Sequence, residues 1–110
     1  MLKTKEIIEL TKKLKVLYVE DDTILRKDTT SLLLHYFEKV DSAVDGMDGI
    51  NMYHIFHGNW NTFYDLIIFD IKMPNMDGIE MMKKILRINP IQISIAISAY
   101  NESDKLQEIM

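Results

Sequence analysis

Two short hydrophobic runs that close on acidic residues constrain the fold of this chain more than any other feature. The first covers residues 16–19 and is followed by Glu20 and Asp21; the second covers residues 66–69 and is followed by Asp70. Runs rich in Val, Ile and aromatic residues are typical of buried strands. In a parallel sheet, the carboxyl ends of the strands share one edge, where such folds bind ligands. We therefore expect the three carboxylates to converge.

Helical segments alternate with strands along the chain. We expect strands at 15–20, 40–44, 66–70 and 91–98, and helices at 2–14, 23–37, 48–56, from Gly78 to Pro90, and from about 103. This alternation predicts an α/β fold, a doubly wound parallel sheet with helices on both faces. Asp22 and Asp77 are expected to cap the helices that follow them. The expected apolar helix faces are Leu2, Ile7, Leu10 and Leu14; Leu25, Leu32, Leu33 and Phe37; and Ile79, Met82, Ile85 and Leu86.

Composition narrows the function classes. Of the 110 residues, 47% are hydrophobic and 27% charged, which is typical of a globular domain. A net charge of −4 gives no electrostatic reason to bind nucleic acid. There is no cysteine, so thiolate chemistry and disulfides are excluded. The apolar runs are shorter than a membrane span, and the N-terminus lacks the apolar core of a signal peptide, so a cytoplasmic location without membrane association is expected.

Three converging carboxylates repel one another unless a cation joins them, and oxygen ligands favour Mg²⁺. A carboxylate such as Asp70 can attack a phosphoryl group to give an acyl phosphate. Asp21, Asp70 and the backbone carbonyl just beyond Asp70 would hold the ion, with Glu20 reaching it through water. Ser98, expected at the end of the last strand on the same edge, offers a hydroxyl to the phosphoryl oxygens.

The sequence resembles the receiver domain of two-component response regulators. The resemblance runs from about residue 15 to the end of the chain, and the matching segments are VLYVEDD (16–22), DLIIFDIKMPNMDGIE (65–80) and ISAY (97–100). It implies a flavodoxin-like strand order of 2-1-3-4. It also implies a regulatory domain, not an enzyme, with residues 1–14 as a helical extension and 15–110 as the receiver domain.

The same resemblance implies a role for each site residue. Asp70 is the phospho-acceptor, charged from a phosphohistidine on a sensor histidine kinase or a histidine phosphotransfer protein. Glu20 and Asp21 are the acidic metal pair, and they bind Mg²⁺ with Asp70 and the backbone carbonyl of Lys72. Ser98 is the switch hydroxyl, and Lys72 and Tyr100 occupy positions that tune dephosphorylation.

The chain departs from the family after Ser98. Family members continue with a fifth strand, which carries a phosphate-pairing lysine, and a fifth helix, whereas 12 residues follow Ser98 here. We expect this last unit to be missing and no lysine of this chain to take that role; neither Lys72 nor Lys105 is at the matching position. The last strand then has an exposed apolar edge. A truncated chain, or a fragment of a longer regulator, is the expected reason, and a homodimer through this edge would cover it.

Other interpretations remain open. The domain could act as a phosphorylation-independent pseudo-receiver that binds partner proteins through its helices. The acids after the first strand could be solvated strand-end residues that cap a helix. A metal-dependent phosphohydrolase of related topology needs a second aspartate two residues after the nucleophile, and Lys72 at that position disfavours it.

Overall fold

A four-stranded parallel sheet forms the centre of the computed structural model, which describes residues 1–97. Its strands are β1 (Lys15–Val19), β2 (Lys39–Ala43), β3 (Leu66–Asp70) and β4 (Ser94–Ile97), in the order β2-β1-β3-β4. All three neighbouring pairs are parallel. The predicted α/β class and strand order are therefore confirmed. The predictions for Ser98, Tyr100, Lys105 and the final helix lie outside the described residues.

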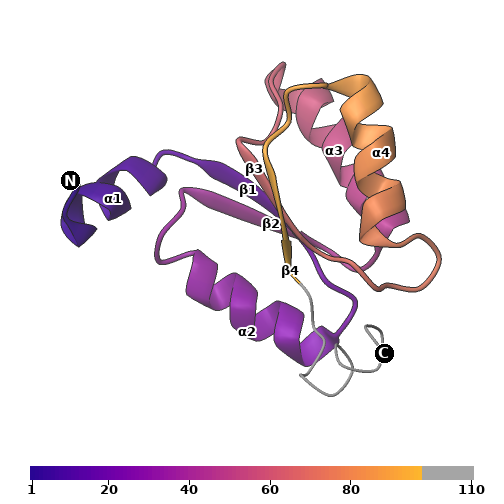
Figure 1. Cartoon of the computed structure of the whole chain (residues 1–110), viewed down its shortest axis with the longest axis horizontal. Helices are drawn as coiled ribbons and strands as arrows, with labels where there is room; N and C mark the ends of the chain where they lie inside the picture. Colours follow the sequence, from indigo (N-terminus) through magenta and orange to yellow (C-terminus); the bar gives the residue numbers. More distant parts are fainter. Residues whose placement is uncertain (98–110) are drawn as a thin grey trace.

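Helices cover both faces of this sheet (Figure 1). One face carries α2 (Thr23–Leu33), and the other carries α3 (Gly46–Trp60) and α4 (Gly78–Ile88). The N-terminal helix α1 (Thr4–Thr11) projects away from the sheet, and none of its residues is buried in the described part of the chain. Of the predicted apolar face, Leu2, Ile7 and Leu10 are exposed, and Leu14, beyond the end of α1, is half-buried. Within residues 1–97, no helix is both long and apolar enough to cross a membrane.

The side chains of β1 and β3 alternate between two cores, as the period of a strand requires. Leu17, Val19, Ile67 and Phe69 point to the larger core, which they share with Tyr53, Phe56, Met81, Met82 and Ile85 from α3 and α4. Val16, Tyr18 and Ile68 point to a smaller core under α2, where Leu33 and Phe37 pack against them. Both strands are almost entirely buried, which explains their uninterrupted hydrophobic sequences.

The expected apolar faces of α2 and α4 are only partly correct. Leu25 and Leu32 of α2 are exposed, whereas Leu33 and Phe37 pack against the smaller core. In α4, Ile79 and Leu86 are exposed and Met81 takes a core position instead. All four residues of β4 are also exposed.

Several element boundaries also differ from the prediction. The helix expected over 2–14 covers only Thr4–Thr11, and the helix expected over 23–37 ends at Leu33. The helix expected over 48–56 begins earlier, at Gly46, and continues as α3 to Trp60. It ends at Asn61, which has a left-handed φ of 54° and donates its N–H to the His57 carbonyl. The strand expected over 91–98 begins only at Ser94. The buried Gln92, which precedes the strand, accepts a hydrogen bond from the Tyr53 hydroxyl at 2.6 Å, and its backbone N–H donates to the Asn89 carbonyl.

Candidate functional site

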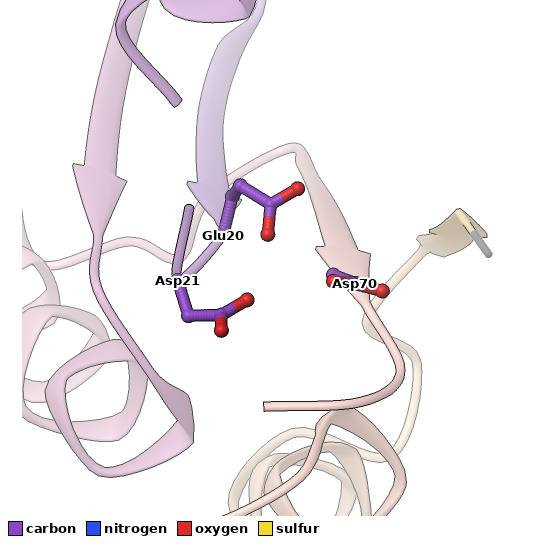
Figure 2. Close-up of side chains that lie close together, drawn as sticks. All are labelled: Glu20, Asp21 and Asp70. Carbon is purple, nitrogen blue, oxygen red and sulfur yellow. The ribbon is translucent and has the colours of Figure 1, made fainter. Parts of the chain in front are cut away.

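The three carboxylates expected to converge lie together at the carboxyl ends of the two central strands. Glu20 and Asp21 follow β1, and Asp70 is the last residue of β3. One oxygen from each carboxylate lies within 4.8 Å of the other two. Figure 2 shows the three carboxyl groups turned toward a common space between the two strand ends. This geometry suits a small cation with oxygen ligands.

Burial makes the electrostatics of this cluster unfavourable without a cation. Glu20 is 3% exposed and Asp70 is 7% exposed, whereas Asp21 is exposed to solvent. Burial raises the pKa of Glu20 to about 7, and hydrogen bonding with Asp21 and the nearby charge of Asp70 act in the same direction. Near neutral pH, the Glu20 carboxyl group is therefore protonated in a substantial fraction of the molecules, and a bound cation would compete with that proton.

The turn between β1 and α2 is shaped by its own polar groups. The Asp22 carboxylate caps α2 by accepting the N–H of Leu25 at 2.8 Å, as expected. The backbone N–H of Asp22 also points to the Glu20 carboxylate, at 3.4 Å. Arg26 Nη1 donates to the backbone carbonyls of Glu20 at 2.8 Å and of Asp21 at 3.3 Å. Arg26 therefore holds the backbone that carries the acidic pair.

The loop after Asp70 turns back sharply to start α4. The Gly78 N–H donates to the Ile71 carbonyl at 2.8 Å, which closes the loop at its base. A Cβ at Gly78 would lie 2.4 Å from the backbone oxygen of Asp70, so only glycine fits there. Lys72 lies exposed in this loop, two residues beyond Asp70. Asp77 caps α4 by accepting the Glu80 N–H at 2.8 Å, as predicted.

The same loop is attached to the start of α3. The side-chain amide of Asn75 donates to the Asp45 carboxylate at 2.8 Å, and the Gly46 N–H donates to the Met76 carbonyl at 3.1 Å. A Cβ at Gly46 would lie 2.6 Å from that carbonyl oxygen, so the backbones meet there in a way that glycine allows. These contacts join two loops that are distant in the sequence.

Sequence reasoning did not single out Arg26, Asp45 or Asn75. Arg26 had one signal, a basic residue one turn into the helix that follows the acidic pair. Asp45 precedes a glycine and indicated only a turn, although its carboxylate caps α3 by accepting the Asp48 N–H at 2.8 Å. The contact between Asp45 and Asn75 spans 30 positions, so no local pattern could indicate it.

An open, doubly wound parallel sheet with clustered carboxylates at its carboxyl edge defines a class of α/β proteins that bind ligands at that edge. Within this class, the family model for the response regulator receiver domain matches residues 16–110. The chain belongs to the response regulator receiver domain family. Receiver domains are regulatory.

Individual relatives agree with this assignment. The chain is 32% identical over 97 residues to the chemotaxis protein CheY of Treponema pallidum, an alignment that covers 87% of this chain and 65% of CheY. The chain thus spans less than two thirds of the length of CheY. An alignment with the much longer sensor protein EvgS of Escherichia coli covers 94% of this chain but 8% of that protein. Its similarity to these proteins therefore concerns one domain of the longer ones.

Solved structures resemble the chain in three dimensions. The N-terminal domain of an uncharacterized protein from Wolinella succinogenes is 34% identical with a TM-score of 0.68, and the match covers 87% of this chain and 73% of that one. CheY in a crystal structure of a CheX–CheY complex with BeF3⁻ and Mg²⁺ from Borrelia burgdorferi is 27% identical with a TM-score of 0.67, covering 91% and 72%.

Proposed function

We propose that this domain receives a phosphoryl group on Asp70 in a Mg²⁺-dependent reaction, as a regulatory module in the cytoplasm and not as an enzyme. The donor is a phosphohistidine on a sensor histidine kinase or a histidine phosphotransfer protein. The observation that carries this proposal is the grouping of three carboxylate oxygens within 4.8 Å of one another. Membership of the receiver family supports it.

The residues present fit a magnesium ion. All the donors are oxygens, the chemistry that Mg²⁺ requires, and the ion keeps several water ligands. Asp21, Asp70 and the backbone carbonyl of Lys72 would bind it, with Glu20 acting through water. When bound, Mg²⁺ neutralises the negative charge that gathers as the phosphoryl group meets the carboxylates.

The chemistry itself falls to Asp70. A carboxylate oxygen of Asp70 attacks the phosphorus, and an acyl phosphate bond forms as the bond from phosphorus to the donor's imidazole nitrogen breaks. The electron pair of the broken bond stays on the imidazole. The hydroxyl of Ser98 would follow the phosphoryl oxygens, and Lys72 and Tyr100 would tune the lifetime of the acyl phosphate.

We also propose that a second copy of the chain pairs along the outer edge of β4. The support is the position of β4 at the end of the strand order within residues 1–97, and the exposure of Ile93, Ile95 and Ile97. An exposed apolar edge strand is a template for pairing with another strand. Residues 91–97 contain no charged residue to oppose such pairing.

Phosphorylation can be tested with a small phosphodonor. The protein is incubated with acetyl phosphate, with and without Mg²⁺, and the added phosphoryl mass is measured by intact-protein mass spectrometry. We expect modification that requires Mg²⁺ and is lost in Asp70→Asn. Asp65→Asn is the matched control, because it makes the same change before β3, where the Asp65 carboxylate accepts the Lys15 N–H at 2.8 Å.

The outcome separates this function from a phosphorylation-independent interaction module. Such a module would show neither modification nor Mg²⁺ binding, and this result would refute the proposed function. That interpretation is not favoured, because the three acidic residues are all in place and lie together.

A further inference from the structure

The loop that joins β3 to α4 is held at its base and again at its crest. At the base, the Gly78 N–H bonds to the Ile71 carbonyl at 2.8 Å. At the crest, Asn75 donates its side-chain amide to Asp45 at 2.8 Å, and Met76 accepts the Gly46 N–H at 3.1 Å. The segment between these attachments includes Lys72. The base and crest contacts thus limit the positions that its backbone can adopt.

The backbone at the crest has an uncommon conformation. Asn75 has a φ of 68°, in the left-handed region that non-glycine residues seldom occupy. Asparagine tolerates this region better than most residues, at a cost that surrounding contacts must offset. The hydrogen bond to Asp45 is such a contact. Asn75 is itself exposed, so burial does not hold it in place.

The partner of Asn75 is fixed to the rigid part of the fold. Asp45 caps α3, and its other carboxylate oxygen accepts the Asp48 N–H at 2.8 Å. Hydrogen bonds from that N–H and from the Asn75 amide lower the pKa of Asp45, so the carboxylate is ionised and accepts strongly. The helix behind it is anchored in the larger core by Tyr53 and Phe56.

We propose that the hydrogen bond between Asp45 and Asn75 is a tether that positions the β3–α4 loop, and with it the Lys72 carbonyl, for metal binding beside Asp70. This inference rests on the proposed function for its effect on Mg²⁺, but the tether itself is a property of the metal-free chain. Outer contacts of this kind typically change metal affinity about 10-fold or more when they are removed. Asp45 and Asn75 are thus positioning residues that bind no ligand themselves.

Four variants separate the loss of this hydrogen bond from a change in backbone conformation, a change in charge and a general effect at the start of α3. Asn75→Gly removes the amide but keeps a residue that adopts positive φ easily. Asn75→Asp places a second carboxylate against Asp45. Asp45→Asn combined with Asn75→Asp exchanges donor and acceptor, and it restores the hydrogen bond without changing the net charge. Asp48→Ala is the control, because Asp48 accepts the Val44 N–H at 3.0 Å at the same end of α3 and does not contact the loop in the bonds described.

Two measurements are made on each variant. Hydrogen exchange of the Gly78 amide, followed by NMR without metal, reports the order of the loop. Titration with Mg²⁺ alone, by calorimetry, reports the affinity of the site. We expect Asn75→Gly and Asn75→Asp to speed the exchange and to weaken Mg²⁺ binding about 10-fold. In the double variant with Asp45→Asn and Asn75→Asp, the exchange rate and the Mg²⁺ affinity should both return to within about 2-fold of the original protein. Asp48→Ala should leave both measurements near their original values.

The tether would be overturned if hydrogen exchange of the Gly78 amide were unchanged in Asn75→Gly. It would also be overturned if the double variant with Asp45→Asn and Asn75→Asp behaved like Asn75→Asp alone. Equal effects in Asp48→Ala would do the same, since they would indicate a general effect at the end of α3. If the original protein binds no Mg²⁺, the proposed function fails, and the metal-free exchange still decides whether the tether exists.

Discussion

Glu20, which follows β1, and Asp70, which ends the adjacent strand β3, have carboxylate oxygens within 4.8 Å of each other, although both residues are more than nine-tenths buried. Two buried carboxylates at this separation repel each other when both are ionised. Folding places them there because the hydrophobic strands β1 and β3 pair side by side and in register from Val16 and Leu66. The packing of the sheet therefore creates an electrostatic cost that a proton or a cation can relieve.

This cost should make the stability of the metal-free protein fall as pH rises. The pKa of Glu20 is about 7 in the folded protein, against an ordinary value of 4.5. Between these values, the folded protein keeps a proton that the unfolded chain releases, so raising the pH favours unfolding. From about pH 5 to about pH 8, we expect a loss of up to about 3 kcal/mol in the free energy of unfolding.

Urea unfolding in the presence of a chelator measures this slope. Glu20→Gln should flatten it, because the amide does not titrate. Glu80→Gln, at an exposed carboxylate in the first turn of α4, is the control and should keep the slope. A Glu20→Gln variant with the original pH dependence would show that Glu20 is not the group responsible.

Mg²⁺ should stabilise the folded protein above the pKa of Glu20. An ion that binds only the folded state at a hundred times its dissociation constant adds about 2.7 kcal/mol to the free energy of unfolding. We expect Asp21→Asn to lose most of this gain, measured as the shift in thermal midpoint with added MgCl₂. Asp28→Asn, an exposed aspartate on α2, should retain it. A comparable gain from NaCl at equal ionic strength would contradict a specific site.

Gly78 should tolerate no side chain. In Gly78→Ala, the new Cβ would lie 2.4 Å from the backbone oxygen of Asp70 and 2.4 Å from the ring of Phe69. The backbone at Asp70 must then shift, at a cost of about 2 kcal/mol or more. Gly58→Ala is the matched control, because it lies within α3 with nothing within 4 Å of its new Cβ. There we expect a gain of about 0.5–1 kcal/mol. Chemical denaturation of both variants checks the difference in sign.

Self-association through β4 should depend on its exposed isoleucines. Ile95 is 50% exposed in the middle of the edge strand. Replacing it with lysine puts a charge on this edge, a substitution that opposes strand pairing between copies. We expect Ile95→Lys to shift the protein toward monomer in sedimentation equilibrium, whereas Ile55→Lys, at an exposed site on α3, should leave the distribution unchanged. A monomeric original protein over the measured concentrations would contradict the proposed pairing.

The sequence predicted most of the fold because the two central strands, β1 and β3, are buried on both sides. Residues 66–69 form a continuous hydrophobic run that local pattern alone identifies, and β3 consists of this run and Asp70. Patterns were less reliable where chain segments compete for contacts. Ile79 and Met81 both suit an apolar helix face, and only the packing of α4 on the sheet selects Met81 for the core.

For this protein, the sequence by itself determined the α/β class, the acidic residues that gather at one sheet edge and the caps at Asp22 and Asp77, because these depend on local pattern and on the direction of parallel strands. The strand order followed from the resemblance to the receiver family. Only the tertiary structure decided how far the carboxylates are buried, and this burial raises the pKa of Glu20. It alone also joined Asp45 to Asn75. Burial and long-range hydrogen bonds depend on how distant segments pack, and that information is not contained in any short stretch of the chain.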